Sequence, residues 1–165
     1  LAMLVGWNFR KVAGYELVVK SGEQVWGTGG LPLIPTGLFD RPPIQMNRES
    51  HEIVLILNIT RDVTKPALRF VNTWDVQPQW IVTSDLVGPV TNAAHALSLS
   101  LEVSRKIKTL QDVWEAEKIH LFTVMPAPLA TLVGYRLNAI CPLHLYFMDH
   151  TENTYKIAGV LSNNM

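Results

Sequence analysis

Apolar residues occur along this chain in short runs and in helical stripes, and the two patterns alternate. The clearest run, residues 52–59, is almost continuously apolar and rich in β-branched residues, which is typical of a strand buried on both faces of a parallel sheet. Further strands are predicted over residues 15–20, 23–26, 80–84, 119–124, 143–149 and 155–161. Helices are predicted over residues 1–12, over 64–74 with Thr64 as a possible cap, from Thr91 or Asn92 toward Lys118, and after residue 128. This alternation predicts a layered, largely parallel α/β architecture.

One segment occurs twice. Residues 1–7 read Leu-Ala-Met-Leu-Val-Gly-Trp and residues 129–135 read Leu-Ala-Thr-Leu-Val-Gly-Tyr, so that five of seven positions are identical. A linker, an apolar stretch, a polar turn and an aromatic residue follow each copy, with Trp26 in the first and Tyr155 in the second. Similar amphipathic helices can also match by chance. A duplicated helix, strand and hairpin predicts a pseudo-two-fold axis and a roughly symmetric ligand across it.

Composition limits the functions to consider. Fourteen basic residues balance fourteen acidic ones and only 17% of the 165 residues are charged, which disfavours a broad nucleic-acid-binding face. Cys141 is the only cysteine, and no apolar run reaches the roughly 18 residues of a membrane span, so we expect a cytoplasmic protein. A strand is expected before the first helix, which suggests that the chain is a fragment of a longer protein.

A phosphate-binding loop is predicted after the buried strand. Thr60, Arg61 and Lys65 combine a hydroxyl, a guanidinium and an ammonium group at the start of a helix, where backbone N–H groups are free. The alternative is an ordinary surface loop, with Thr64 merely capping the helix.

Two other kinds of residue can line a ligand site. The elbow at residues 125–128 brings backbone and apolar surface close to a ligand, and an aromatic ring such as Trp26 or Tyr155 can stack on a nucleobase. The Gly- and Pro-rich residues 27–48 predict an irregular segment, which is usually an interface, a lid or a disordered stretch.

Catalytic motifs are weak. The glycines at residues 27–30 match neither a Walker A loop nor a dinucleotide fingerprint, and the five histidines show no recognised metal spacing. Asp149 and His150 at a strand end suit acid–base chemistry, although a turn into the last hairpin explains them equally well.

The second half of the chain carries a family resemblance. The strand at residues 119–122 (Ile-His-Leu-Phe), the elbow and small-residue helix at 125–130 (Met-Pro-Ala-Pro-Leu-Ala) and residues 132–135 (Leu-Val-Gly-Tyr) resemble the closing signature of SAVED domains. An early hairpin ending in Trp26, and the buried strand followed by Thr60 and Asp62-Val63, are also similar to that family.

The resemblance implies a fold and a function. The expected fold is α/β, with two fused Rossmann-like (CARF-like) units, pseudo-two-fold symmetry and mostly parallel sheets flanked by helices. Residues 1–165 would form one sensor domain with approximate halves 1–75 and 76–165. It would bind a cyclic di- or trinucleotide and self-associate, activating a fused effector outside this chain in bacterial antiviral defence of the CBASS type. No catalysis, cofactor, metal, membrane or direct DNA binding is expected of the domain itself.

In such a site we expect Thr60, Arg61 and Lys65 to contact phosphate, Trp26 and Tyr155 to contact bases, and Met125, Pro126 and Ala127 to form the wall. Two alternatives stay open. One is a small α/β nucleotide-processing enzyme or hydrolase that uses Asp149-His150 or the Asp62 loop. The other is a structural module that holds subunits together through residues 27–48.

Overall fold

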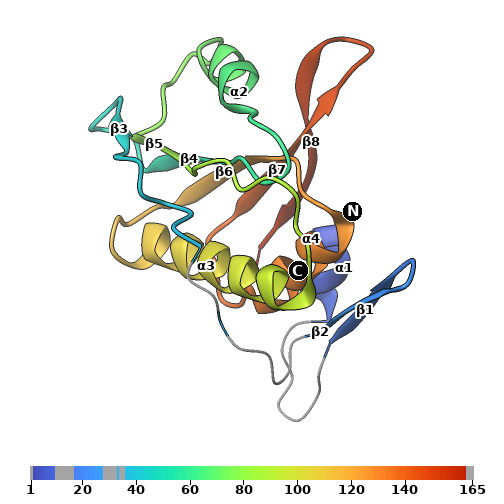
Figure 1. The fold of residues 1–165 in the computed structure, drawn as a ribbon. Helices are drawn as coiled ribbons and strands as arrows, with labels where there is room; N and C mark the ends of the chain where they lie inside the picture. Colours follow the sequence, from blue (N-terminus) through green and yellow to red (C-terminus); the bar gives the residue numbers. More distant parts are fainter. Residues whose placement is uncertain (1, 10–16, 28–32, 34–35, 163–165) are drawn as a thin grey trace.

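A six-stranded sheet forms the centre of the protein (Figure 1). The computed structural model describes residues 2–9, 17–27, 33 and 36–162. The strands of the sheet are β3 (Ile44–Gln45), β4 (Glu52–Leu57), β5 (Trp80–Thr83), β6 (Lys118–Thr123), β7 (Leu143–Asp149) and β8 (Thr154–Leu161), in the order β3-β5-β4-β6-β7-β8. The four central strands are parallel, and an antiparallel strand, β3 or β8, closes each edge. The expected mixed α/β class with a mostly parallel sheet is therefore confirmed.

Helices cover both faces of this sheet (Figure 1). The helices are α1 (Ala2–Asn8), α2 (Thr64–Val71), α3 (Ala93–Asp112) and α4 (Ala127–Arg136). Because successive side chains of a strand point to opposite faces, Ile53 and Leu55 of β4 join the core shared with α3 and α4, whereas Val54 and Ile56 join the core beneath α2. All four are fully buried, as the apolar run over residues 52–59 predicted.

The two copies of the repeat form matching elements. In the first copy, α1 precedes the hairpin of β1 (Val18–Ser21) and β2 (Gln24–Gly27); in the second, α4 precedes the hairpin of β7 and β8. The six-stranded sheet takes strands from both sides of residue 75, so the division into halves at that position stays a prediction.

The repeated helices α1 and α4 cross at their glycines. A Cβ atom on Gly6 would lie against the carbonyl oxygen of Thr131 and 2.8 Å from the amide nitrogen of Tyr135. A Cβ atom on Gly134 would lie against the carbonyl oxygen of Met3 and 3.0 Å from the amide nitrogen of Trp7. Residues 3, 6 and 7 are the repeat equivalents of 131, 134 and 135, so the contacts are reciprocal, as an approximate dyad between the two helices requires.

Several element boundaries differ from expectation. The prediction that Thr64 caps α2 is wrong: Thr64 is the first helical residue, and the Asp62 carboxylate accepts a hydrogen bond from its N–H at 2.8 Å. The short strand β3 was not expected within the Gly- and Pro-rich segment. Asn92 does cap α3, since its side chain accepts from the His95 N–H. The predicted start of the first strand, at residues 15–16, lies outside the described residues.

A polar network crosses the strands at their amino ends, on the face covered by α2. The carboxylate of Glu52 on β4 pairs with Lys118, and it also lies 2.9 Å from Nε2 of His120. The other ring nitrogen of His120 lies 3.0 Å from the hydroxyl of Tyr146, and the ring of Trp74 packs 4.6 Å from the imidazole. Burial lowers the pKa of His120 despite the nearby carboxylate, and it also lowers the pKa of His144.

We therefore expect acid to destabilise the fold. The unfolded chain binds protons on these histidines below a pKa of about 6.5, whereas the folded chain binds them only at lower pH. The free energy of unfolding should therefore fall as the pH is lowered from 7.5 to 5.5. Urea denaturation at the two pH values measures this loss. In His120→Gln the loss should be smaller than in the original protein, because only His144 then keeps its lowered pKa. An unaltered pH dependence in His120→Gln would contradict the assignment.

Candidate functional site

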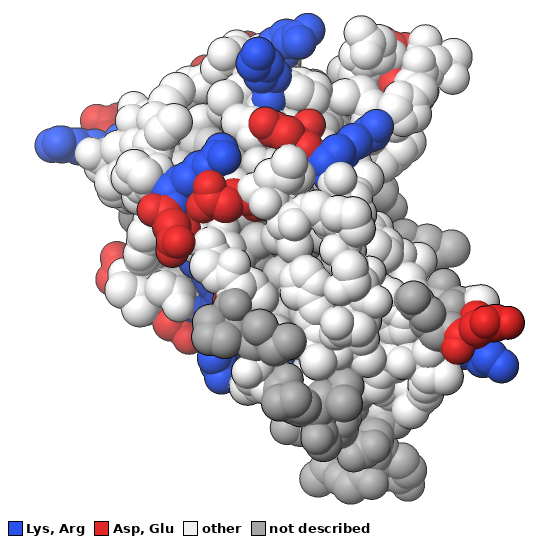
Figure 2. All heavy atoms as spheres, viewed as in Figure 1, with Lys and Arg blue, Asp and Glu red and all other residues white. Residues whose placement is uncertain are grey.

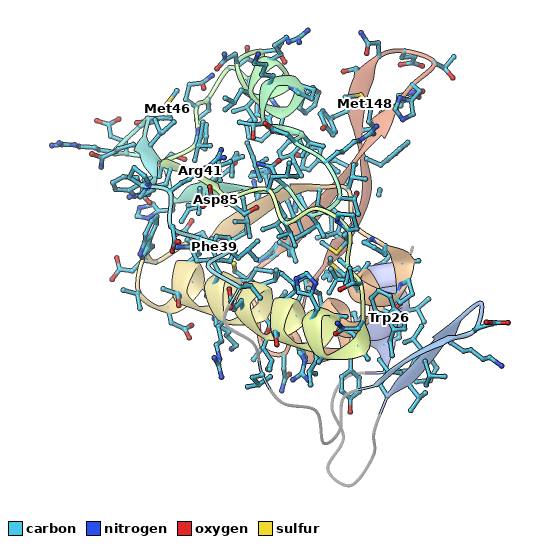
Figure 3. All side chains as sticks on the ribbon, viewed as in Figure 1. Trp26, Phe39, Arg41, Met46, Asp85 and Met148 are labelled. Atoms are coloured by element: carbon cyan, nitrogen blue, oxygen red, sulfur yellow. The ribbon has the colours of Figure 1, made fainter. Side chains whose placement is uncertain are left out.

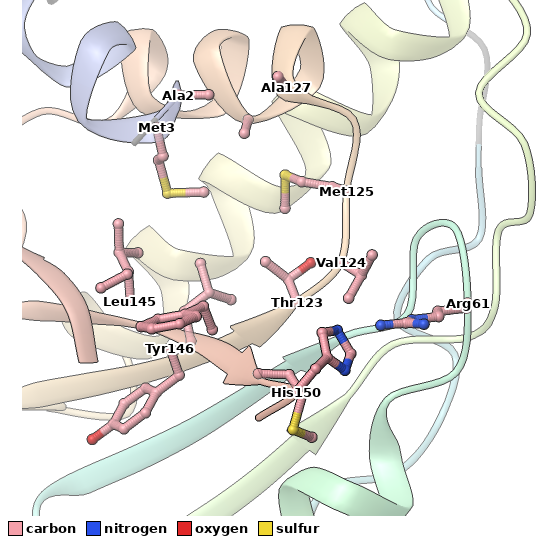
Figure 4. A pocket seen from close by; sticks show the side chains of 15 residues that line it. Ala2, Met3, Arg61, Thr123, Val124, Met125, Ala127, Leu145, Tyr146 and His150 are labelled. Carbon is pink, nitrogen blue, oxygen red and sulfur yellow. The ribbon is translucent and has the colours of Figure 1, made fainter. Parts of the chain in front are cut away.

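A cavity of about 430 Å³ opens at the carboxyl ends of β6 and β7 (Figure 4). Its size falls in the range of roughly 300–1,000 Å³ usual for small-molecule sites. Open α/β sheets bind ligands beyond the carboxyl ends of their strands, so its position is the one that the fold favours. Several parts of the chain meet there: the starts of α1 and α4, the ends of β6 and β7, the loop after β4, the tip of the β7–β8 hairpin, and β8 through Ala158.

Arg61 brings a cation to this cavity. It lies in the loop between β4 and α2, and its guanidinium group reaches toward the cavity from the side opposite the strands β6 and β7 (Figure 4). Among the described residues, no ion pair or hydrogen bond uses that group. Its donors, which suit two oxygens of a phosphate at once, therefore remain available to a ligand.

The buried side chain of Asn58 fixes the loop that carries Arg61. Its Oδ1 accepts from the Val63 N–H at 2.8 Å, and its Nδ2 donates to the Thr64 hydroxyl at 2.9 Å and to the Ser84 carbonyl at 3.1 Å. Its own N–H donates to the Ser84 hydroxyl at 2.8 Å. The amide thus joins the end of β4, the start of α2 and the end of β5. This role is not predicted from the sequence, because Asn58 falls within the run that predicts the buried strand.

Thr60 has a different role from the one predicted in the phosphate-binding loop. Its N–H and its hydroxyl both donate to the carbonyl of Val124, at 3.2 and 3.0 Å. These bonds tie the loop after β4 to the end of β6, where Val124 itself lines the cavity. Thr60 therefore holds two walls of the site together, and its proton donors are already used.

The two repeated helices provide the wall opposite the sheet. Ala2 and Met3 of α1 and Ala127 of α4 line the cavity together with Met125 of the elbow (Figure 4). Pro126 is the N-cap residue of α4 and has an extended backbone, with φ −58° and ψ 142°, so the predicted elbow is present. The cavity thus lies beside the approximate dyad between α1 and α4.

The other predicted site residues lie elsewhere. Lys65 is exposed on the first turn of α2 and does not line the cavity. Tyr155 is only 5% exposed, packs against Phe70 and Phe122, and lines a separate cavity of about 260 Å³ between α2 and the β7–β8 hairpin. Trp26 is 4% exposed in the core beside α3 and lies far from Met148 of the site (Figure 3). The structure brings together Arg61, Met125 and Ala127, with Thr60 and Pro126 next to them in the chain.

Sequence reasoning missed part of the lining. Phe147, Met148 and His150, from the end of β7 and the hairpin tip, also line the cavity, and the His150 ring lies near the Arg61 side chain (Figure 4). Their position at the carboxyl end of a parallel strand could have indicated them, because open α/β sheets bind ligands there. His150 had been considered only for acid–base work with Asp149.

The carboxylates considered for catalysis are engaged in structure. Asp149 pairs with Lys156 at 2.7 Å and accepts from the Thr151 N–H at 2.9 Å, contacts that lower the pKa of Asp149. Hydrogen bonds from Thr64 likewise lower the pKa of Asp62, which lies just before α2. The described residues contain no cluster of three or more His, Cys, Asp or Glu that could hold a metal ion. These carboxylates give no support to the hydrolase alternative.

Charge is spread over the molecule rather than gathered near the cavity. Figure 2 shows basic and acidic side chains interspersed on one face, with wide uncharged areas between them. None of the described helices is long and apolar enough to cross a membrane. An anion at the cavity therefore depends on local donors such as Arg61.

Comparison with known proteins adds a family to this geometry. The family model described as "SMODS-associated and fused to various effectors sensor domain" (SAVED) matches residues 1–161. No curated protein matches the chain.

Solved structures share the fold. An Acinetobacter baumannii Cap4 SAVED/CARF-domain receptor with the cyclic trinucleotide 3′3′3′-cAAA aligns with a TM-score of 0.76 and 18% identity, covering 96% of this chain and 35% of the receptor. The same receptor with 2′3′3′-cAAA gives 0.76 and 20%, again over 96% and 35%. A Moraxella osloensis Cap4 receptor gives 0.73 and 17%, over 98% of this chain and 34% of the receptor. The chain thus spans about a third of the length of these receptors.

Proposed function

This chain belongs to the SAVED family of sensor domains, and from that premise we propose that it binds a cyclic oligonucleotide in the cavity beside α1 and α4. The observation that carries the proposal is Arg61, a cation with unused donors that a buried asparagine holds at the mouth of a mainly apolar cavity. Guanidinium groups bind phosphate oxygens in pairs, which supports a phosphodiester ligand.

The apolar lining supports contact with a nucleobase. Met125 and Met148 offer flexible, polarisable side chains that adapt to a flat ring, and Phe147 offers an aromatic surface that is 45% exposed. We assign base contact to these residues and not to Trp26 or Tyr155, since both are buried in the core.

A cyclic trinucleotide is the ligand we propose, because the Cap4 receptors of the same fold carry cyclic trinucleotides. The reciprocal crossing of α1 and α4 supports a ligand with repeated chemical units, since both helices bring their first turns to one cavity. We further propose that binding drives self-association and activates an effector carried outside this chain, in the cytoplasm of a bacterium defending itself against phage. In this proposal the domain binds its ligand without turning it over.

Thermal unfolding with a panel of cyclic di- and trinucleotides tests the proposal. A ligand at 100 times its Kd should stabilise the fold by about 2.7 kcal/mol, which raises Tm by several degrees. The linear trinucleotide of the same bases is the matched control and should give a much smaller shift. Recovery of intact ligand afterwards, by chromatography, is expected of a sensor. If no cyclic nucleotide shifts Tm at millimolar concentration, the proposed function is wrong.

A further inference from the structure

A second, basic groove lies between the second half of α3 and the end of α4. It has a volume of about 450 Å³ and is formed by the last turns of α3 and the end of α4. Its lining residues are Ser104, Arg105, Lys108, Thr109, Asp112, Val113 and Arg136. None of them lines the candidate site, so this groove is a separate feature of the surface.

Three cations meet in this groove. Arg105 and Lys108 are three residues apart on α3 and therefore share one face of the helix, and Arg136 reaches them from the last turn of α4. Asp112 is the single carboxylate in the lining, and its Oδ1 accepts a hydrogen bond from Gln111. The groove therefore carries an excess of positive charge although the whole chain is neutral.

The protein leaves these cations unneutralised. Among the described residues, no ion pair includes Arg105, Lys108 or Arg136. Burial lowers the pKa of Arg136, and the nearby charge of Arg105 acts in the same direction, yet a guanidinium group stays protonated in proteins. Placing like charges together in a half-buried position costs free energy, which an anion between them would offset.

Neutral groups hold two of the three cations in position. Arg136 donates from Nε to the Ser100 hydroxyl at 3.0 Å, which leaves its two terminal nitrogens for another acceptor. Lys108 donates from Nζ to the carbonyl of Ala139 at 3.2 Å and keeps two further protons. The donors of Lys108 and Arg136 are thus oriented before any anion binds. Binding an anion therefore costs less side-chain entropy than it would if all three side chains moved freely.

We propose that this groove is an oxyanion site that binds a phosphoryl group, either inorganic or carried on a nucleotide. Two guanidinium groups and an ammonium group match the several oxygens of a phosphoryl group better than the two oxygens of one carboxylate. The site is independent of the proposed cyclic-oligonucleotide cavity and would exist even if that cavity bound another ligand.

Titration calorimetry of the full chain with sodium pyrophosphate tests this site. We expect saturable 1:1 binding, weakened about tenfold in Arg105→Gln and in Lys108→Gln, because a hydrogen bond to a charged group is lost in each. Lys20→Gln is the matched control, since it removes one exposed positive charge on β1 and should leave the affinity unchanged.

Further titrations identify the source of the phosphoryl group. Tighter binding of a nucleoside diphosphate than of pyrophosphate would indicate a nucleotide, and equal binding would indicate the inorganic anion. An acidic peptide that binds with higher affinity than either would overturn the assignment to phosphoryl groups. Absence of binding at 10 mM pyrophosphate, or an equal loss in Lys20→Gln, would overturn the site itself. Circular dichroism of each variant checks that it is folded.

Discussion

Gly6→Ala and Gly134→Ala should each destabilise the protein by about 3 kcal/mol, near the upper end of the usual cost of overpacking. In each case the new methyl group would be forced against a backbone carbonyl of the other helix, and a backbone atom cannot turn away as a side chain can. Neither glycine has a positive φ, so the cost comes from the helix crossing and not from backbone strain. Because the contacts are reciprocal, the two losses should be similar.

Guanidinium denaturation measures both losses. Gly27→Ala is the matched control, since a Cβ atom there would meet its nearest neighbours at an ordinary 3.9 Å, and its stability should stay within about 1 kcal/mol of the original. If either helix variant is as stable as this control, α1 and α4 do not cross at their glycines. The approximate dyad between the two helices would then no longer support a ligand with repeated chemical units.

Arg61→Gln should weaken cyclic trinucleotide binding about 10- to 100-fold, which corresponds to one or two charge-assisted hydrogen bonds lost to phosphate. Folding should be almost unaffected, because Arg61 is exposed and no described ion pair depends on it. Calorimetric titration measures the affinity, and thermal unfolding without ligand measures the stability.

Lys65→Gln is the control for Arg61. It removes the same charge four residues later, on the first turn of α2, where the side chain does not line the cavity, and it should change the affinity less than threefold. Equal weakening in the two variants would mean that only the general field of positive charge matters. An equal loss of stability and affinity in Arg61→Gln would remove the assignment of Arg61 to phosphate.

The sequence predicted features that depend on local patterns. The apolar run after Glu52, as far as Leu57, indicated a strand buried on both faces. The seven-residue segment that occurs at residues 1–7 and again at 129–135 indicated two related helices. Arg61 was predicted as a phosphate-binding residue because it follows a parallel strand, at the edge of the sheet where ligands bind, and the structure places it in the lining of the cavity. These inferences required neither distant contacts nor the packing of particular side chains.

Burial of the aromatic residues could not be predicted in the same way. Trp26 and Tyr155 follow polar turns and therefore looked available to a ligand, but each packs into a core formed by residues far away in the chain. The capping of α2 depended on a similar detail. Asp62 and Thr64 are both residue types that favour the N-cap, but the N-cap residue is Val63, whose N–H donates to the buried Asn58, while Asp62 accepts from the Thr64 N–H.

The amide of Asn58 has a consequence for the speed and selectivity of recognition. A loop already ordered in the free protein spares the ligand the cost of immobilising it, which is about 1–2 kcal/mol for each backbone residue. Arg61 is then already in position when a ligand arrives. Anions that do not match the positions of its donors dissociate at once, without a slow rearrangement of the loop. If the proposed function holds, a binding loop that is ordered in advance lets the domain respond to a change in ligand concentration without a slow folding step.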